Sequence, residues 1–309
     1  MIILQDSQIK KIFHNGDEVK KILDWDGNVI FYKQSGGGGM TNDIKFTTSP
    51  SVSSANVFTV TYTDSTQDTL SYSEPSKEYS LSIPTDKIVN KIDFDNTMVD
   101  EVKVSCKVNL SKTFFTNKPK TIRLLNCDAT SSTSLEYLFN SATKTETIEM
   151  KNSDFSNVTN MSSMFYDCIK LTSLDLSNFN TSNVTAMRSM FGECNNLTSL
   201  DLSNFNTSNV TNMGGMFENC NNLTSLDLSN FNTSNVFNIS SMFYRCSNLT
   251  SLDLSNFNIR NGTNMGAMFY YCNKLTTIKM IGCNQMTIDK IKDELKRASI
   301  LNNVTIITE

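Results

Sequence analysis

The chain has 309 residues, a formal net charge of −4, and 39% hydrophobic and 19% charged residues. This composition is typical of a folded protein with room for more than one domain. The mild acidity and the lack of a basic stripe argue against nucleic-acid binding. No segment has the apolar length of a membrane span, and the first residues lack the pattern of a signal peptide, so we expect no membrane insertion.

Residues 1–34 contain short β-forming runs around two strong hairpin signals, Asn15-Gly16 and Asp26-Gly27. We predict three short strands here, followed by a flexible Gly-rich linker over residues 35–40. The pattern NG-x-EV-KKI before a Gly-rich stretch resembles the N-terminal segments of phage tail and fibre proteins. That resemblance implies an attachment module that docks on other virion proteins and, by analogy with fibres, a homotrimer. Alternatively, Met40 is the true start and residues 1–39 are an added tag.

Residues 41–98 are rich in Thr, Ser and β-forming residues. Five runs have strand character: DIKFTTS, NVFTVTYTD, TLSYS, EYSLSIP and KIVNKIDF. We therefore predict a small β domain, Ig-like or sandwich-like, whose topology the pattern leaves open. It could seal the first turn of the array that follows.

From about residue 99 to residue 309 the chain repeats with a period of 26 residues, nearly letter for letter in the copies that begin at Leu171, Leu197, Leu223 and Leu249. A fixed period of this length predicts a solenoid, whose units bury their apolar faces by stacking on one another. The divergent stretch at about 287–309 predicts a cap made of a charged amphipathic helix, residues 287–299, and a last strand.

Within a unit, L-T-S-L-D-L-S predicts a short strand and N-F-N-T-S-N a turn. Met161, Met164, Phe165 and Cys168 stand at i, i+3, i+4 and i+7, the spacing of one helix face. We therefore predict a mixed α/β solenoid of strand-turn-helix units, similar to a leucine-rich-repeat array, with a parallel sheet on one face and helices on the other.

The unit L-x-x-L-D-L-S-N-F-N-T-S-N-V-T-N-M-x-x-M-F-x-x-C resembles the repeat of the BspA-like leucine-rich-repeat surface proteins. The resemblance is strong over about residues 148–277 and weak on the flanks. It implies adhesion to cells or matrix, a mostly bacterial setting, and no catalytic residues.

Five of the eight cysteines are one period apart: Cys168, Cys194, Cys220, Cys246 and Cys272. A column of equivalent positions does not converge on one point, which argues against a metal site. We expect these cysteines to be small buried side chains with reduced thiols.

A row of equivalent acids, continued by Glu149, stands in the strands: Asp175, Asp201, Asp227 and Asp253. Because the leucines on either side point inward, these carboxylates must face solvent, where serines flank them. The row could bind a polar ligand such as a glycan, or Ca²⁺ bridging neighbouring acids. It could also simply keep the sheet soluble. Arg123 and Lys279 bracket the row.

The residue pairs after each Met-Phe vary between copies: Tyr166-Asp167, Gly192-Glu193, Glu218-Asn219, Tyr244-Arg245 and Tyr270-Tyr271. Aromatic and arginine side chains dominate binding hot spots. We therefore predict a contact surface at Tyr244, Arg245, Tyr270 and Tyr271, with Arg188 as a further departure from the repeat. Neutral drift on an exposed face would give the same variation. Phe237 and Arg260 are also departures found in one copy.

Catalysis has no support in the sequence, because the lone histidine, His14, lies beside a turn signal and no catalytic motif is present. We expect a non-enzymatic attachment protein, most simply a phage virion component in a tail or head fibre, whose solenoid binds a glycan or protein receptor on a host cell. The alternatives are a BspA-like adhesin on a bacterial surface and a capsid decoration protein with no receptor.

Overall fold

The computed structural model describes residues 21–23, 29–32, 41–50, 52, 56–94, 99–115, 118–177 and 179–309. The chain forms two compact units, Met1–Gly39 and Met40–Glu309. In the first unit, β1 (Lys21–Leu23) and β2 (Val29–Tyr32) pair as an antiparallel hairpin. The strands on either side of Asp26-Gly27 therefore pair as predicted. That turn, Asn15-Gly16 and the predicted first strand lie outside the described residues.

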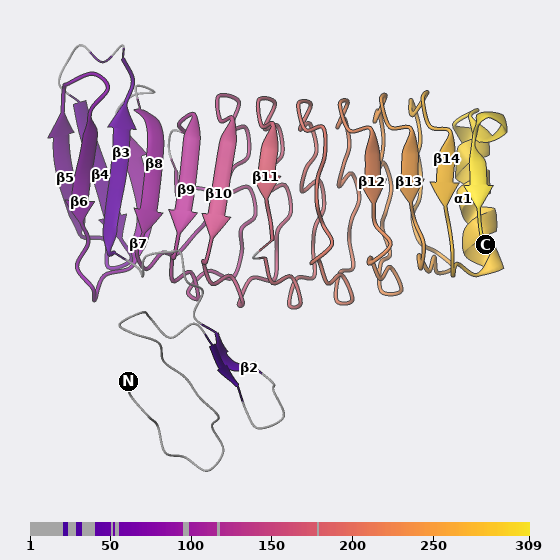
Figure 1. Ribbon diagram of the computed structural model, residues 1–309, viewed down its shortest axis with the longest axis horizontal. Helices are drawn as coiled ribbons and strands as arrows, with labels where there is room; N and C mark the ends of the chain where they lie inside the picture. Colours follow the sequence, from indigo (N-terminus) through magenta and orange to yellow (C-terminus); the bar gives the residue numbers. More distant parts are fainter. Residues whose placement is uncertain are drawn as a thin grey trace. The chain divides into compact units, whose positions relative to one another are not determined.

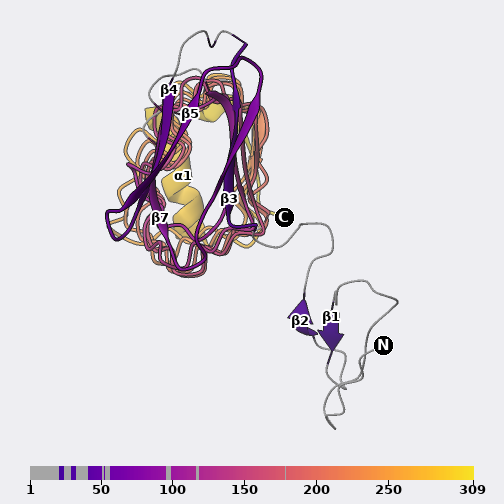
Figure 2. The same ribbon diagram turned by 90° about the vertical axis from the view of Figure 1, so that its left-hand side faces the viewer.

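The second unit begins with a β module in which all five predicted strand segments are strands: β3 (Asp43–Thr48), β4 (Asn56–Tyr62), β5 (Gln67–Tyr72), β6 (Glu78–Ser82) and β7 (Val89–Phe94). With β8 (Val99–Ser105) they form two antiparallel sets, β6-β3-β8 and β5-β4-β7. The ring of Phe46 in β3 lies 4.8 Å from that of Phe58 in β4 and 5.6 Å from that of Phe94 in β7. The two sets thus face each other across an aromatic core (Figure 2).

Both sets of this module continue into the repeat array, as Figure 1 shows for the strands β3, β8, β9 and β10. β8 pairs antiparallel with β3 on one side and parallel with β9 (Thr121–Leu125) on the other. In the other set, Val89 and Ile92 of β7 bridge in parallel to Val108 and Phe115 of the first coil. The module therefore covers the end of the solenoid core.

One wall of the solenoid is a parallel sheet, as predicted. It contains β10 (Thr147–Lys151), β11 (Ser173–Asp175), β12 (Ser225–Asp227), β13 (Ser251–Asp253), β14 (Thr277–Lys279) and β15 (Thr305–Ile307). From β9 to β11 and from β12 to β14, partners differ by 26 residues, such as Leu226 and Leu252. Residues 199–201 form no strand, so this wall consists of two sheets rather than one.

The opposite wall overturns the predicted strand-turn-helix unit, because its residues form turns and not helices. Among the described residues there is one α-helix, α1 (Gln285–Arg297), and it belongs to the C-terminal cap. The second unit is therefore a β-solenoid, and the expected mixed α/β, leucine-rich-repeat-like array is wrong. No helix in the described part of the chain is long and apolar enough to cross a membrane.

The backbone of this turn wall alternates between two hydrogen-bond partners. The N–H groups of Met161, Ser163 and Phe165 donate to carbonyl oxygens of the next coil at 2.8 to 2.9 Å. The N–H groups between them, such as that of Met164, donate to the carbonyl three residues earlier in the same coil. Ser163 has φ +53°, a left-handed conformation that no α-helix contains. The wall is thus a ladder of turns held by contacts between coils.

The core prediction for this wall holds although the helix does not form. Met161, Met164, Phe165 and Cys168 are fully buried, and so are their equivalents in the following copies apart from Met265, which is 7% exposed, and Cys246, which is 1% exposed. Phenylalanine rings stack along the solenoid at centroid distances of 5.5 to 6.2 Å, in the order Phe115, Phe139, Phe165, Phe191, Phe217, Phe243 and Phe269.

The cysteine column is buried and its thiols are free, as predicted. Each thiol also donates a hydrogen bond to the carbonyl of a phenylalanine in the preceding coil; Cys220, for example, donates to Phe191 at 3.1 Å. Burial raises the pKa of Cys220 to about 12, so the thiol stays protonated and remains a donor. The column therefore links neighbouring coils as well as filling the core.

The predicted C-terminal helix is α1, which begins two residues before the expected start. The side chain of Asn284 caps it by accepting a hydrogen bond from the N–H of Thr287 at 2.8 Å. Asn284 stands one period after Asn258, so the helix takes the place that the turn wall of a further coil would occupy. A short 3₁₀ turn, η1 (Leu301–Asn303), and β15 complete the cap.

Candidate functional site

The acid row lies on the strand wall, and its carboxylates are engaged within their own coils. Oδ1 of Asp175 accepts hydrogen bonds from the N–H and the hydroxyl of Ser177 at 3.0 and 2.6 Å. Asp201, Asp227 and Asp253 accept the N–H of the serine two residues later at 2.9 Å. The hydrogen bonds from Ser177 lower the pKa of Asp175. Each aspartate therefore closes the turn after its strand, a role that the sequence prediction missed.

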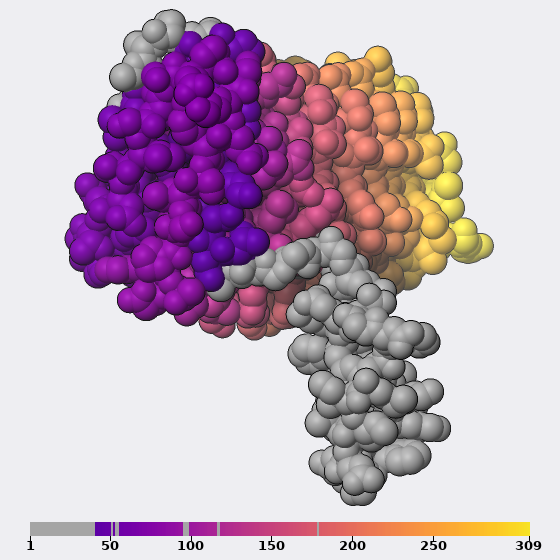
Figure 3. All heavy atoms as spheres, turned by 60° about the vertical axis from the view of Figure 1, so that its left-hand side comes forward, coloured from indigo at the N-terminus to yellow at the C-terminus, as the bar shows by residue number. Residues whose placement is uncertain are grey.

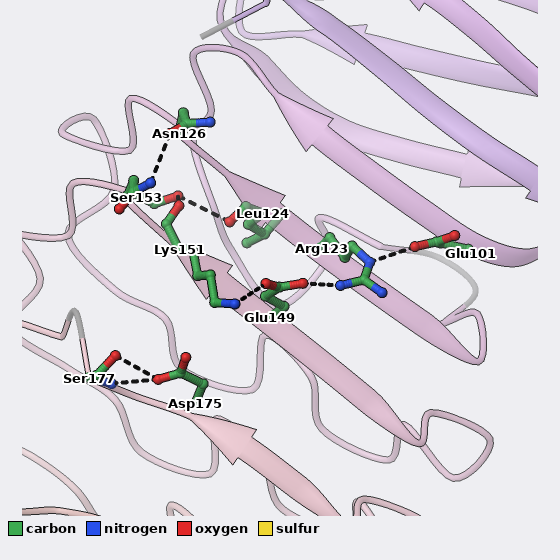
Figure 4. Close-up of polar contacts among 10 residues, drawn as sticks. Glu101, Arg123, Leu124, Asn126, Glu149, Lys151, Ser153, Asp175 and Ser177 are labelled. Carbon is green, nitrogen blue, oxygen red and sulfur yellow. Dashed lines mark hydrogen bonds and ion pairs between the residues drawn. The ribbon is translucent and has the colours of Figure 1, made fainter. Parts of the chain in front are cut away.

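Basic residues neutralise both ends of the row, as predicted (Figure 4). Arg123 bridges Glu101 at 2.6 Å and Glu149, and Lys151 also pairs with Glu149, at 2.5 Å. At the other end, Lys279 lies 3.1 Å from Asp253.

The middle of the row has no such partner. In the described part of the chain, no ion pair reaches Asp201 or Asp227. The described residues also contain no group of three or more His, Cys, Asp and Glu side chains that could hold a metal ion. Each aspartate carboxylate of the row already accepts a hydrogen bond that closes a turn. Nothing in the geometry of the row supports the expected Ca²⁺ site.

The variable pairs after each Met-Phe form a strip along the turn wall, one pair per coil. The second residue of every pair is left-handed, with φ between +57° and +64°: Asp167, Glu193, Asn219, Arg245 and Tyr271. Asp and Asn adopt this conformation readily, whereas a bulky residue there is uncommon. The successive coils lie as consecutive bands of surface (Figure 3). Side chains of the strip can therefore combine across coils.

Three of the four predicted contact residues form one cluster. The ring centroids of Tyr244 and Tyr271 are 5.5 Å apart with an interplanar angle of 89°. The guanidinium of Arg245 lies 5.3 Å from the ring of Tyr244 and 5.4 Å from that of Tyr271, in reach of cation–π attraction. Tyr270 joins through its backbone, since its carbonyl accepts the N–H of Arg245 at 2.8 Å. Tyr271 is 52% exposed and Tyr270 is 37% exposed.

Glu218 links the remaining predicted residue, Arg188, to this cluster. Burial and then the nearby charge of Glu193 raise the pKa of Glu218, while Arg188 and Arg245 oppose that shift. Glu218 therefore lies within the electrostatic reach of both arginines. The sequence prediction did not name Glu218 as a site residue, although it occupies the same variable slot as Tyr244. We call Arg188, Glu218, Tyr244, Arg245, Tyr270 and Tyr271 the aromatic–arginine patch.

The two sets of predicted site residues, the acid row and the aromatic–arginine patch, lie on different walls of the solenoid. The acids follow the strand wall, whereas the patch follows the turn wall from the coil of Arg188 to the last full coil before α1. A ligand of the patch therefore meets aromatic rings and arginine, and a ligand of the acid row meets carboxylates and serines.

The fold defines a β-solenoid repeat protein. The family described as Mycoplasma protein of unknown function, DUF285, matches residues 108–200, 133–225 and 194–305, which together cover more than half of the chain. The chain belongs to this family, a repeat family related to the BspA-like surface repeats. The resemblance of the repeats is thereby confirmed. The matches begin at residue 108 and give no support to the phage-like resemblance of residues 1–34. Among the curated proteins and the solved structures, no match was found.

Proposed function

We propose that this chain is a non-enzymatic attachment protein whose solenoid binds a receptor on a cell surface through the aromatic–arginine patch. The observation that supports the proposal is the cluster of Tyr244, Arg245 and Tyr271 in a slot of the repeat that varies in every copy. Tyrosine and arginine dominate binding hot spots because they offer large, rigid contact areas and directed hydrogen bonds. Membership in a family related to surface repeats is compatible with adhesion.

The direct test is binding of the fluorescently labelled full chain to intact cells. We expect Arg245→Ala and Tyr271→Ala each to weaken binding by about tenfold, because each removes an exposed hot-spot side chain and the cation–π contact between them. Lys274→Ala is the matched control, since Lys274 is an exposed cation outside the patch that donates to Asn248. Equal binding by all three variants would show that the patch is not the contact surface.

The finer proposal is that the chain is a component of a phage particle, in a tail or head fibre, and docks there through residues 1–34. Its support is the β1–β2 hairpin and the Gly-rich sequence that follows it, in a compact unit separate from residues 40–309. The alternative is a bacterial cell-surface adhesin, which the family match favours.

Immunogold electron microscopy of an induced source culture distinguishes the two locations, with antibody raised against residues 99–309. Gold on phage-like particles would favour the virion location, and its position on tails or on heads would show which part of the particle contains the chain. Gold on the cell envelope alone would rule out the virion and leave the adhesin. Deleting residues 1–40 should abolish incorporation into particles and leave cell binding intact.

A further inference from the structure

A pocket of about 330 Å³ lies between α1 and the turn wall of the last full coil. Thr263, Asn264, Met265 and Gly266 of the coil line it on one side. Lys290, Asp293, Glu294 and Arg297 of α1 line it on the other. Its volume is within the usual range for small-molecule sites. None of its lining residues belongs to the aromatic–arginine patch or to the acid row.

One lining residue, Glu294, has a buried carboxylate oxygen without a partner. Glu294 is 3% exposed, and its Oε1 pairs with Arg297 at 2.5 Å. Its Oε2 has no hydrogen-bond partner among the described residues. A buried acceptor without a partner destabilises the folded chain, and more so when it is charged. A group that donates a hydrogen bond to this oxygen would therefore be stabilised here.

The opposite wall of the pocket offers an unpaired donor. In the other copies of the repeat, the N–H of the residue equivalent to Met265 donates to the next coil; that of Met213, for example, donates to Asn238 at 2.9 Å. For Met265 the equivalent acceptor would be residue 290, which lies in α1, and no acceptor for the N–H of Met265 is found in the described residues. A group that accepts from Met265 and donates to Glu294 must have both capacities, and a hydroxyl is the simplest group that does.

The charges of the pocket favour a neutral ligand. Lys290 and Arg297 are balanced by Asp293 and Glu294, so a strongly charged ligand gains little net attraction. Lys290 uses one of its three N–H donors on the carbonyl of Arg260 and keeps the others for a ligand. The lining therefore suits a neutral molecule with several hydroxyl groups.

An exposed aromatic residue is joined through its backbone to one residue of this lining. Phe237 replaces the threonine of equivalent coils, such as Thr211, and at 59% it is the most exposed of the large hydrophobic side chains in the described residues. Its carbonyl accepts the N–H of Asn264, which lines the pocket, at 2.9 Å. An aromatic face packs against the apolar C–H groups of a sugar ring, as it does against other apolar surfaces. Phe237 is thus bonded through its backbone carbonyl to Asn264 of the polar pocket.

We propose that this pocket binds a carbohydrate, with one saccharide unit between Glu294 and Met265 and its apolar face on Phe237. The choice of a glycan ligand rests on the proposed attachment function, which it makes more specific. The site itself rests only on the pocket. Two departures from the repeat found in one copy, Phe237 and Arg260, each bond through a backbone carbonyl to a lining residue, Asn264 and Lys290 respectively. The aromatic–arginine patch does not explain them.

The test is saturation-transfer-difference NMR on the full chain with methyl glycosides of glucose, galactose, mannose, rhamnose, N-acetylglucosamine and N-acetylgalactosamine, together with a printed glycan array. We expect at least one glycoside to bind, with the strongest transfer to C–H protons on one face of its ring. Phe237→Thr should weaken that binding by about tenfold. Because it restores the residue of the equivalent coils, this variant should fold normally.

Glu294→Gln should also weaken glycoside binding, because the amide accepts hydrogen bonds less strongly than a carboxylate. Tyr137→Asn, which removes an exposed aromatic far along the chain, is the matched control and should bind normally. If no glycoside or printed glycan binds, or if Phe237→Thr binds as well as the parent chain, the carbohydrate site is wrong.

Cell binding separates this inference from the proposed function. If the parent chain binds cells but no glycoside, the carbohydrate site fails and the attachment function stands. If it binds a glycoside but no cells, the site stands and the attachment function fails.

Discussion

Replacing Thr207 by valine removes a hydroxyl that joins two neighbouring coils. The hydroxyl of Thr207 donates to the carbonyl of Asn232 at 3.1 Å and accepts the N–H of the same residue at 2.8 Å. Thr207 is 1% exposed, and valine has nearly the same shape, so the substitution removes hydrogen bonds without opening a cavity. It therefore isolates the polar contribution to the contact between coils.

The expected cost is about 2 kcal/mol. Two hydrogen bonds contribute roughly 0.5–1.5 kcal/mol each. Valine has no hydroxyl to desolvate on folding, and this gain offsets part of the loss. Asn232 is exposed, so water can satisfy its backbone groups in part, which keeps the cost from being larger. The measurement is equilibrium urea unfolding followed by circular dichroism.

Thr211→Val is the matched control. The hydroxyl of Thr211 is exposed and donates to the carbonyl of Thr185, which already accepts the N–H of Thr211. Its loss leaves no backbone group unpaired, and we expect a cost below about 0.5 kcal/mol. Equal costs for the two variants would refute the view that the buried threonine column stabilises the contact between coils.

Four further predictions concern ionisable groups and thiols. Cys220→Ala should lower the free energy of unfolding by about 1 kcal/mol more than the loss of a buried methylene-sized group explains. The reason is that the carbonyl of Phe191 loses its donor, and the same unfolding assay measures the difference. The buried thiols of the parent chain should react with Ellman's reagent only at the rate of unfolding, and fast reaction would contradict the high pKa of Cys220. The pKa values of Asp175 and Asp253 are lowered by hydrogen bonds from neighbouring serines, although burial alone would raise that of Asp253. The stability that they contribute is therefore present above the ordinary aspartate pKa and should be lost as the pH falls through the lowered values, which thermal unfolding below about pH 4 would detect. The pKa of Glu218 is raised, so its contribution has the opposite sign: Glu218→Gln should raise the thermal midpoint at pH 7 and leave it unchanged below the ordinary glutamate pKa.

The repeat period, the parallel sheet and the buried column could be predicted from the sequence because they depend on which residues are apolar and how often they recur. The helix could not be excluded from that pattern. Apolar residues at i, i+3, i+4 and i+7 fill the core equally well when the chain forms turns that alternate with left-handed residues, as at Ser163. The backbone hydrogen bonds decide between helix and turns: the N–H of Met161 donates to the next coil and not to a residue of its own coil. A hydrogen bond between two coils produces no recognisable pattern within the sequence of a single repeat unit.

The near identity of the copies has a physical reason that the sequence alone did not reveal. Asn204, for example, donates from its side chain to the carbonyls of Leu176 and Phe179 in the preceding coil. Such side chains bond to a position one period away, so a change in one copy breaks a contact with the next. Such bonds favour the same residue in successive copies, although variable positions also form some, as Asn219 does with Glu193. The contact surface at the variable slot stays a prediction, whereas the repeated Asp175 and its equivalents close turns within their own coils.

Two residues of the aromatic–arginine patch, Arg245 and Tyr271, have a strained left-handed backbone conformation. A non-glycine residue in this conformation costs roughly 1–2 kcal/mol, and Asn or Asp loses least because its short side chain bonds locally. Asp167 and Asn219 follow that preference, whereas Arg245 and Tyr271 do not. The cation–π contact between them and the ring contact with Tyr244 offset part of this cost. The rest is strain at an exposed site that an asparagine would relieve. Strain that persists where a simpler residue would remove it is typical of functional positions, and it supports this end of the solenoid as the contact surface.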